Sequence, residues 1–166
     1  MNRAPPRVDA AQGLQIEVAI GAIPDDERVW VPQAPDVWFR PLLLDTVRGG
    51  WCNLLRVRRS GVLHRHRHPM AVTGYVIKGR WHYLEHDWIA EAGTFVYEPP
   101  GEIHTLAVPP DCDEMITFFS IGGAMIYLDD AGAVIGYEDV FSKIAMCRRH
   151  YAAVGLGDGY VDAFVR

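Results

Sequence analysis

The sequence predicts an all-β fold, a barrel or sandwich of short strands with one helix near the C-terminal end. Segments rich in apolar and β-branched residues recur along the chain, and turn signals separate them at intervals of roughly 8–12 residues. Only one segment, residues 140–153, shows apolar residues at helical spacing. At 166 residues the chain is long enough for one domain with a substantial core and too short for two ordinary domains.

The first part of the chain leads into the predicted barrel. Residues 1–13 hold two prolines and little to bury, so they predict an N-terminal arm ahead of a single domain of residues 14–166. Leu14–Ile20 alternates weakly, which suits an edge strand or a subunit contact. Val37–Leu44 is apolar and indicates a strand. Pro41 confines that strand to a sheet edge or a bulge because proline donates no ladder hydrogen bond.

The remaining chain alternates strands with turns until the helix. A helix is predicted at 140–153, with Asp139 as its N-cap and Gly155 as its stop signal. The apolar residues expected to face the barrel from this helix are Phe141, Ile144, Ala145, Tyr151 and Ala152. Further strands are predicted at 51–58, twice within 61–79, and at 80–84, 88–90, 94–98, 104–108, 115–121, 124–128 and 134–137.

Composition argues against nucleic-acid and membrane partners. The formal net charge is −5, which offers no attraction to anionic surfaces. No stretch approaches the roughly 18 apolar residues of a membrane span, and no signal-peptide pattern opens the chain. The three widely spaced cysteines, Cys52, Cys112 and Cys147, are expected to be reduced thiols. Together these features predict a soluble cytoplasmic protein.

Histidines in the middle of the chain predict a metal site. His66 and His68 are two residues apart in an extended segment, so their side chains point to the same face of a sheet. His104 can reach the same point from another strand. Three neutral imidazoles suit iron, zinc, nickel or copper, and their ordinary pKa near 6.5 predicts loss of the ion below about pH 6. A solvated basic ribbon is the alternative for the first two histidines, which alternate with arginines.

Two motifs in this region resemble those of the cupin family. The first cupin motif reads Gly-x5-His-x-His-x3–4-Glu-x6-Gly, and the second reads Gly-x5-Pro-x-Gly-x2-His-x3-Asn. The second motif matches at Gly93, Pro99, Gly101 and His104, with Val108 in place of the asparagine. The first matches at His66, His68 and Gly79, with Gly61 one residue closer than usual and Val72 in place of the glutamate. The resemblance implies a double-stranded β-helix, or jelly-roll, barrel.

Within the cupin family, a chain without the motif glutamate has either lost its metal or belongs to the three-histidine group, and the intact His66, His68 and His104 favour the second. Within the family the chain most resembles 2,4'-dihydroxyacetophenone dioxygenases and, more distantly, acetylacetone-cleaving dioxygenases. That resemblance implies Fe(II), with zinc or nickel as alternative metals, held by His66, His68 and His104. It also implies O2 and a small hydroxyketone or diketone as substrates, with cleavage of the C–C bond beside the ketone. For 2,4'-dihydroxyacetophenone the products are 4-hydroxybenzoate and formate.

Two further residues are candidates for catalysis. Glu98 lies where cupins usually place an aliphatic residue, on the inward phase of its strand, so it is expected beside the metal or the substrate. The alternative is a solvated edge carboxylate. Tyr83 is expected within reach of a phenolic substrate. His64 has the phase of His66 and His68 and is expected at the rim of the site, with a ligand role as the alternative. His82, His86 and His150 are expected at the surface.

Two other functional classes remain open on the sequence. A different cupin enzyme, such as a flavonol-type dioxygenase or a metal-dependent isomerase, would keep the same ligands. A non-enzymatic cupin that senses a metal or a small molecule would keep them too. In either case the resemblance implies a homodimer or homotetramer, with Leu14–Ile20 as the expected subunit contact.

Overall fold

The computed structural model describes residues 17–166. The predicted arm of residues 1–13 lies outside them. Of the weak strand predicted at Leu14–Ile20, only residues 17–20 are described, and their backbone is irregular. The described part of that segment is therefore not a strand.

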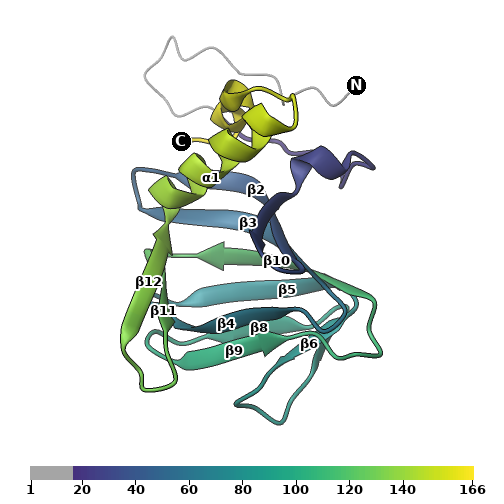
Figure 1. The fold of residues 1–166 in the computed structure, drawn as a ribbon, viewed down its shortest axis with the longest axis vertical. Coiled ribbons are helices and arrows are strands. Elements are labelled where there is room, and N and C mark those ends of the chain that lie inside the picture. Colours follow the sequence, from purple (N-terminus) through teal and green to yellow (C-terminus); the bar gives the residue numbers. More distant parts are fainter. Residues whose placement is uncertain (1–16) are drawn as a thin grey trace.

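Short strands form two antiparallel sheets that pack face to face, with one helix beside them (Figure 1). This confirms the predicted all-β jelly roll. Sheet A has the order β1 (Val31–Ala34), β2 (Val37–Asp45), β3 (Gly50–Arg58), β10 (Glu114–Ile121), β5 (Val72–Lys78) and β8 (Phe95–Glu98). Sheet B has the order β12 (Val134–Asp139), β11 (Ala124–Leu128), β4 (Val62–Arg67), β9 (Ile103–Ala107), β6 (Arg80–Tyr83) and β7 (Ala90–Glu91).

Alternation along the strands explains why the sheets enclose a core. On β3, Trp51, Leu55 and Val57 are buried in the main hydrophobic cluster between the sheets, because every second strand residue faces the same side. Pro41 behaves as its chemistry requires. It lies where the pairing of β2 with β3 shifts register, and outside the part of β2 that pairs with β1. No hydrogen bond between the strands therefore requires the N–H group that proline lacks.

The N-terminal segment covers part of the outer face of sheet A. After a short 3-10 turn, η1 (Glu27–Val29), Trp30 packs with Leu54 of β3 and Ile116 of β10 in a second hydrophobic cluster. The Arg56 guanidinium lies 4.3 Å from the centre of the Trp30 ring and donates to the Glu27 carboxylate. Phe118 of β10 lies partly buried against this cluster. The covered area of the outer face therefore includes β3 and β10.

The helix α1 (Val140–Ala153) has the predicted limits. The Asp139 carboxylate accepts from the Ser142 N–H and the Ser142 hydroxyl accepts from the Asp139 N–H, both at 2.8 Å, which forms a capping box. A 3-10 turn, η2 (Asp158–Ala163), follows. None of the helices in residues 17–166 has the length and hydropathy of a membrane span.

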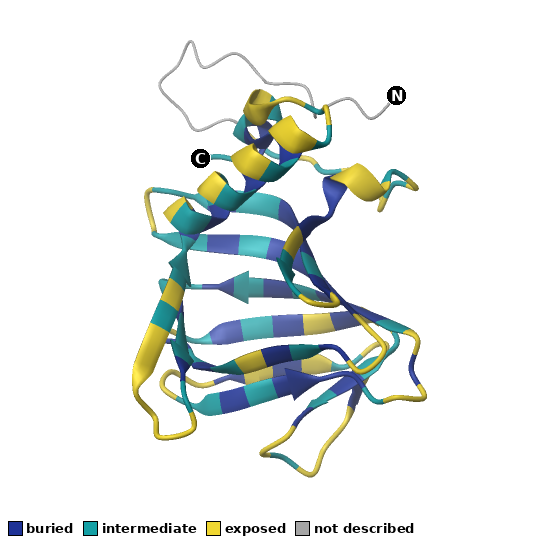
Figure 2. Cartoon of the chain, in the orientation of Figure 1, coloured by how far each residue is buried: buried dark blue, intermediate teal, exposed yellow. Residues whose placement is uncertain are grey.

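The predicted buried face of this helix was wrong in part, since Tyr151 is buried and Ile144 packs against the core but the other three residues do not. Phe141, Ala145 and Ala152 are exposed, and the outer side of α1 is largely exposed in Figure 2. The buried residues are Val140, Lys143, Cys147 and Tyr151. The prediction failed because it counted only apolar residues. Lys143 points inward, where its ammonium group donates to Gln33 at 2.9 Å and pairs with Glu138 at 2.6 Å.

Gly79, which closes the first motif, has a steric reason to be glycine. Its φ is +69°, and a Cβ there would lie 2.2 Å from the Glu114 carbonyl oxygen, which is backbone and has little room to move. Gly79→Ala should therefore lower the free energy of unfolding by about 3 kcal/mol, measured by urea denaturation. Gly93→Ala is the matched control, because Gly93 has φ +95° with open space around its Cβ position. It should cost only about 1–2 kcal/mol. Equal losses in the two variants would contradict the steric argument.

Candidate metal centre

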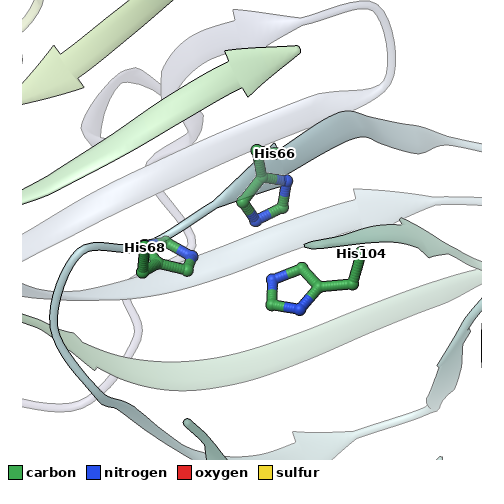
Figure 3. A group of neighbouring side chains, drawn as sticks. All are labelled: His66, His68 and His104. Atoms are coloured by element: carbon green, nitrogen blue, oxygen red, sulfur yellow. The ribbon is translucent and has the colours of Figure 1, made fainter. Parts of the chain in front are cut away.

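The barrel interior brings the three predicted histidines together. His66 on β4 is paired with His104 on β9, and His68 follows just after the end of β4. Figure 3 shows the three rings turned toward one another from these elements. All three are buried, and their ligand nitrogens lie within 4.8 Å of one another. The arrangement is suited to a metal ion.

Hydrogen bonds set the orientation of two of the rings. His66 Nδ1 lies 2.6 Å from the His64 carbonyl oxygen, and His68 Nδ1 lies 3.2 Å from that of Ala124. A carbonyl only accepts, so each Nδ1 must be the protonated nitrogen, which leaves Nε2 as a free electron-pair donor. Both ring nitrogens of His104 are buried and have no hydrogen-bond partner among residues 17–166. Buried polar atoms without partners are costly, and an ion at this point would give His104 the partner it lacks.

His64 contributes through its backbone. The pairing of β4 with β9 shifts register between Leu63 and His66, and both of those residues are buried while His64 is exposed. The irregularity puts the His64 side chain on the opposite side from His66. The expectation that His64 shares the phase of the other two histidines was wrong, because simple alternation ignores a bulge.

Glu98 faces the histidines. The residue is 2% exposed, and its Oε2 lies 3.5 Å from His104 Nε2 and 3.7 Å from His68 Nε2. On β5, the residue paired with Glu98 is Val72, the position where the first cupin motif carries glutamate. The carboxylate that the motif lacks at Val72 is therefore present on the neighbouring strand. Oε2 has no hydrogen-bond partner among the described residues.

Tyr83 is the residue that holds Glu98. Its hydroxyl donates to Glu98 Oε1, and its ring stacks on His104 with 4.1 Å between centroids and 9° between planes. The ring is buried and also contacts Trp88 edge-on. Tyr83 thus fixes both a candidate ligand and the carboxylate beside it. The contact of Tyr83 with a phenolic substrate stays a prediction.

Burial dominates the electrostatics of the site. Loss of solvation lowers the pKa of His66, His68 and His104 to about 3 each, so all three are neutral at pH 7. Burial raises the pKa of Glu98 to about 7, although the hydrogen bond from Tyr83 acts in the opposite direction. The contacts between Glu98 and the neutral imidazoles are therefore not ion pairs. Glu98 is able to hold or release a proton near neutral pH.

These pKa shifts predict that the metal-free protein loses stability in acid. In the unfolded chain the three imidazoles take up protons below about pH 6.5, whereas in the folded chain their pKa of about 3 prevents it. Stability should fall as pH decreases from about 6.5 toward 3. Glu98, whose pKa is raised, has the opposite effect and adds stability as pH falls from about 7 to 4.5. It takes up one proton in the folded chain, whereas the three imidazoles take up three in the unfolded chain, so the net effect of acid is still a loss of stability. For the same reason, we expect protons to displace a bound ion only at a pH lower than the value of about 6 expected from the sequence.

The measurement is the thermal midpoint of chelator-treated protein at several pH values between 7.5 and 4. His104→Ala removes one of the three buried imidazoles and should flatten the dependence relative to wild type. A midpoint that stays constant down to pH 4.5 would show that the imidazoles take up protons within the folded barrel.

The cavity beside the histidines is narrow. Its volume is about 20 Å³, room for roughly one ordered water. Apolar side chains, among them Phe119 and Met125, line most of it, and the polar residues Gln33, Asn53 and Lys143 complete the wall. These three were missed from the sequence. Only Asn53 could have been found from the sequence, because it is a polar residue that alternates in step with Trp51, Leu55 and Val57 and so faces the same buried side of its strand.

Of the other histidines, two have identified polar partners. His86 Nε2 lies 2.9 Å from Glu102 Oε1, and His150 Nε2 lies 2.9 Å from the Arg28 carbonyl. His82 is half-buried on β6. None of the three belongs to the metal-binding group.

The family model of the ChrR cupin-like domain matches residues 21–125, which is more than half of the chain and includes His66, His68, Glu98 and His104. The chain belongs to this cupin family. No curated protein sequence matches this cupin. The match therefore identifies the family and leaves the reaction open.

Solved structures agree with the family. An RmlC-like cupin protein from Ralstonia eutropha JMP134 is 32% identical, with a TM-score of 0.74 over 83% of this cupin and 90% of that chain. A protein of unknown function with a cupin-like fold from the same organism is 24% identical, with a TM-score of 0.70 over 72% and 75%. An acetylacetone dioxygenase from Acinetobacter johnsonii is 15% identical, with a TM-score of 0.67 over 80% and 94%. The last two similarities show a shared fold.

Proposed function

We propose that this cupin is a non-haem Fe(II) dioxygenase that cleaves the carbon–carbon bond beside a ketone. The observation that supports the proposal most is the position of Glu98, a buried carboxylate 3.5 Å from His104 Nε2 and 3.7 Å from His68 Nε2, with a pKa raised to about 7 by burial. Cleavage beside a ketone requires a base for the α-proton, and a base works best when its pKa is near the working pH. The fold shared with an acetylacetone dioxygenase fits this chemistry.

His66, His68 and His104 would hold the metal. An iron ion held there would supply a 2+ charge that favours a deprotonated hydroxyketone and would bring it together with O2. Glu98 Oε2 removes the α-proton of the substrate. Tyr83 donates to Oε1 and so keeps Oε2 directed at the site. The pKa of Tyr83 is raised well above its ordinary value by burial, so its hydroxyl stays protonated and remains a donor.

The proposed substrate is a 2-hydroxyketone, with 2,4'-dihydroxyacetophenone as the first compound to test. With O2 it gives 4-hydroxybenzoate and formate, so that both oxygen atoms enter the products. The cavity of about 20 Å³ is too small for this molecule as it stands, since it has room for roughly one water. Binding therefore requires lining side chains to move, and Met125 is a flexible candidate at the wall.

The test is oxygen uptake by protein loaded with Fe(II), using a panel of 2-hydroxyketones, β-diketones and flavonols, with products identified by chromatography. We expect one O2 consumed per hydroxyketone cleaved. Substrate loss without oxygen uptake would identify an isomerase. Binding of metal with no turnover of any compound would favour a sensing cupin and contradict the proposal.

A further inference from the structure

Six uncharged side chains form an exposed patch at one edge of sheet A. We call it the β5–β8 patch, and it consists of Tyr75, Ile77, Trp88, Ile89, Phe95 and Tyr97. Tyr75 and Phe95 are paired across β5 and β8, and they are 49% and 63% exposed. Tyr97 is 59% exposed. Aromatic side chains at this density in solvent are unusual for a surface that contacts only water.

Strand pairing shows where the patch begins. Phe118 on β10 is paired with Tyr75, so Phe118, Tyr75 and Phe95 form one row across three strands of the outer face. The cluster around Trp30 partly buries Phe118, and the next two aromatic residues in the row are exposed. The outer face of sheet A is therefore covered over β3 and β10 and open over β5 and β8.

The patch also contains a groove. It is lined by Trp88 and Ile89, from the segment between β6 and β7, together with Phe95 and Tyr97 of β8. Its volume is about 320 Å³, which is enough for a large side chain. A surface with both projecting aromatic rings and an apolar groove is able to complement a copy of itself.

We propose that a second copy of this chain packs on the β5–β8 patch around a two-fold axis. Four aromatic residues about half exposed offer roughly 400 Å², given 150–250 Å² for each aromatic side chain. With the two isoleucines and the rim, two copies would bury about 1,000–1,200 Å², which clears the limit of about 1,000 Å² for a biological interface and corresponds to a weak one. The patch is aromatic and free of charge, which is typical of an interface centre. A charged partner protein would find no complementary charge in it.

The interface would reach the candidate metal centre through a single strand. β8 is the outermost strand of sheet A and pairs with β5 alone among the described strands. Its side chains alternate, so Tyr97 points outward into the patch while Glu98 points inward to the histidines. A copy packed on Tyr97 would hold in place the strand that carries Glu98. Such an assembly does not depend on which reaction the protein catalyses.

The experiment is sedimentation velocity on the full chain at about 1–100 μM, which covers the micromolar dissociation constants at the weak end of protein–protein interfaces. The test variants are Phe95→Lys and Tyr97→Lys, since lysine is well tolerated on natural edge strands. The matched controls are Ile135→Lys and Tyr137→Lys on β12, an edge strand of sheet B where both residues are 66% exposed. Circular dichroism of each variant checks that the fold is retained.

We expect the wild type and both β12 variants to sediment as dimers or larger assemblies. Phe95→Lys and Tyr97→Lys should weaken association at least 30-fold, as expected for the loss of a central aromatic contact. If the wild type is a tetramer, the same two variants should reduce it to a smaller species. A wild type that is monomeric at 100 μM, or an assembly that is broken by the β12 variants and not by the patch variants, would overturn the proposal. If one patch variant fails to fold, Ile77→Lys on β5 replaces it.

Discussion

Replacing His104 with alanine should leave the purified protein with less than about a tenth of the wild-type metal content. His104 contributes one of three buried ligand nitrogens, and neither of its ring nitrogens has a hydrogen-bond partner among the described residues. Two histidines on one strand segment would remain, and two imidazoles hold a divalent ion far more weakly than three. Metal content is measured by elemental analysis of protein that has been loaded with Fe(II) without oxygen and then desalted.

His82→Ala is the matched control, because His82 lies on β6 outside the metal-binding group. It should retain full metal content. Since His104 stacks on Tyr83, its removal also leaves a gap in the core, and circular dichroism must show that the variant is folded. His66→Ala supplies a second test from a different strand. Full metal occupancy in a folded His104→Ala protein would refute the three-histidine assignment.

Replacing Glu98 with glutamine should leave the iron content nearly normal and lower turnover of a 2-hydroxyketone by a factor of about 10–1000. Glutamine keeps the volume and one hydrogen-bonding oxygen, so the contact with Tyr83 can survive, but it has no basic carboxylate to remove a proton. The rate should also lose its dependence on the group whose pKa is about 7. Steady-state rates normalised to bound iron, measured from pH 5.5 to 8.5, test both effects.

Tyr83→Phe is the companion variant for this measurement. The hydrogen bond from Tyr83 lowers the pKa of Glu98, so its loss should raise that pKa further and shift the pH–rate profile to higher pH while iron stays bound. Loss of iron together with rate in Glu98→Gln would instead make Glu98 a metal ligand. Unchanged rates would show that Glu98 has no part in the reaction.

The sequence predicted the fold because strand and turn signals are local. Residues 124–128 and 140–153 have the same limits in the structure as in the prediction. The buried face of α1 was predicted only in part, because Lys143 is buried by contacts with residues far away in the chain. Its partner Gln33 is 110 residues distant, and no local pattern shows that a buried lysine will find acceptors.

The site was predicted in part for the same reason. The spacing of His66 and His68 and the proline and glycines before His104 are local features, and they placed three side chains that the structure brings together. The orientation of His64 depended on a register shift between β4 and β9, which arises from pairing across the sheet. The role of Tyr83 as the partner of Glu98 depended on the fold around both residues. Such contacts become visible only in three dimensions.

The pairing of Val72 with Glu98 has a consequence for how relatives of this protein should differ. Directly opposed residues on antiparallel strands have Cβ atoms about 4.5–5.5 Å apart, so a carboxylate at either position reaches nearly the same space. Two carboxylates there would repel each other and strain the site. Across the family we therefore expect the two positions to covary, with glutamate at one and an apolar residue at the other. The double exchange Val72→Glu with Glu98→Val would move the acidic group from β8 to β5 and recreate the family's usual motif inside the same barrel.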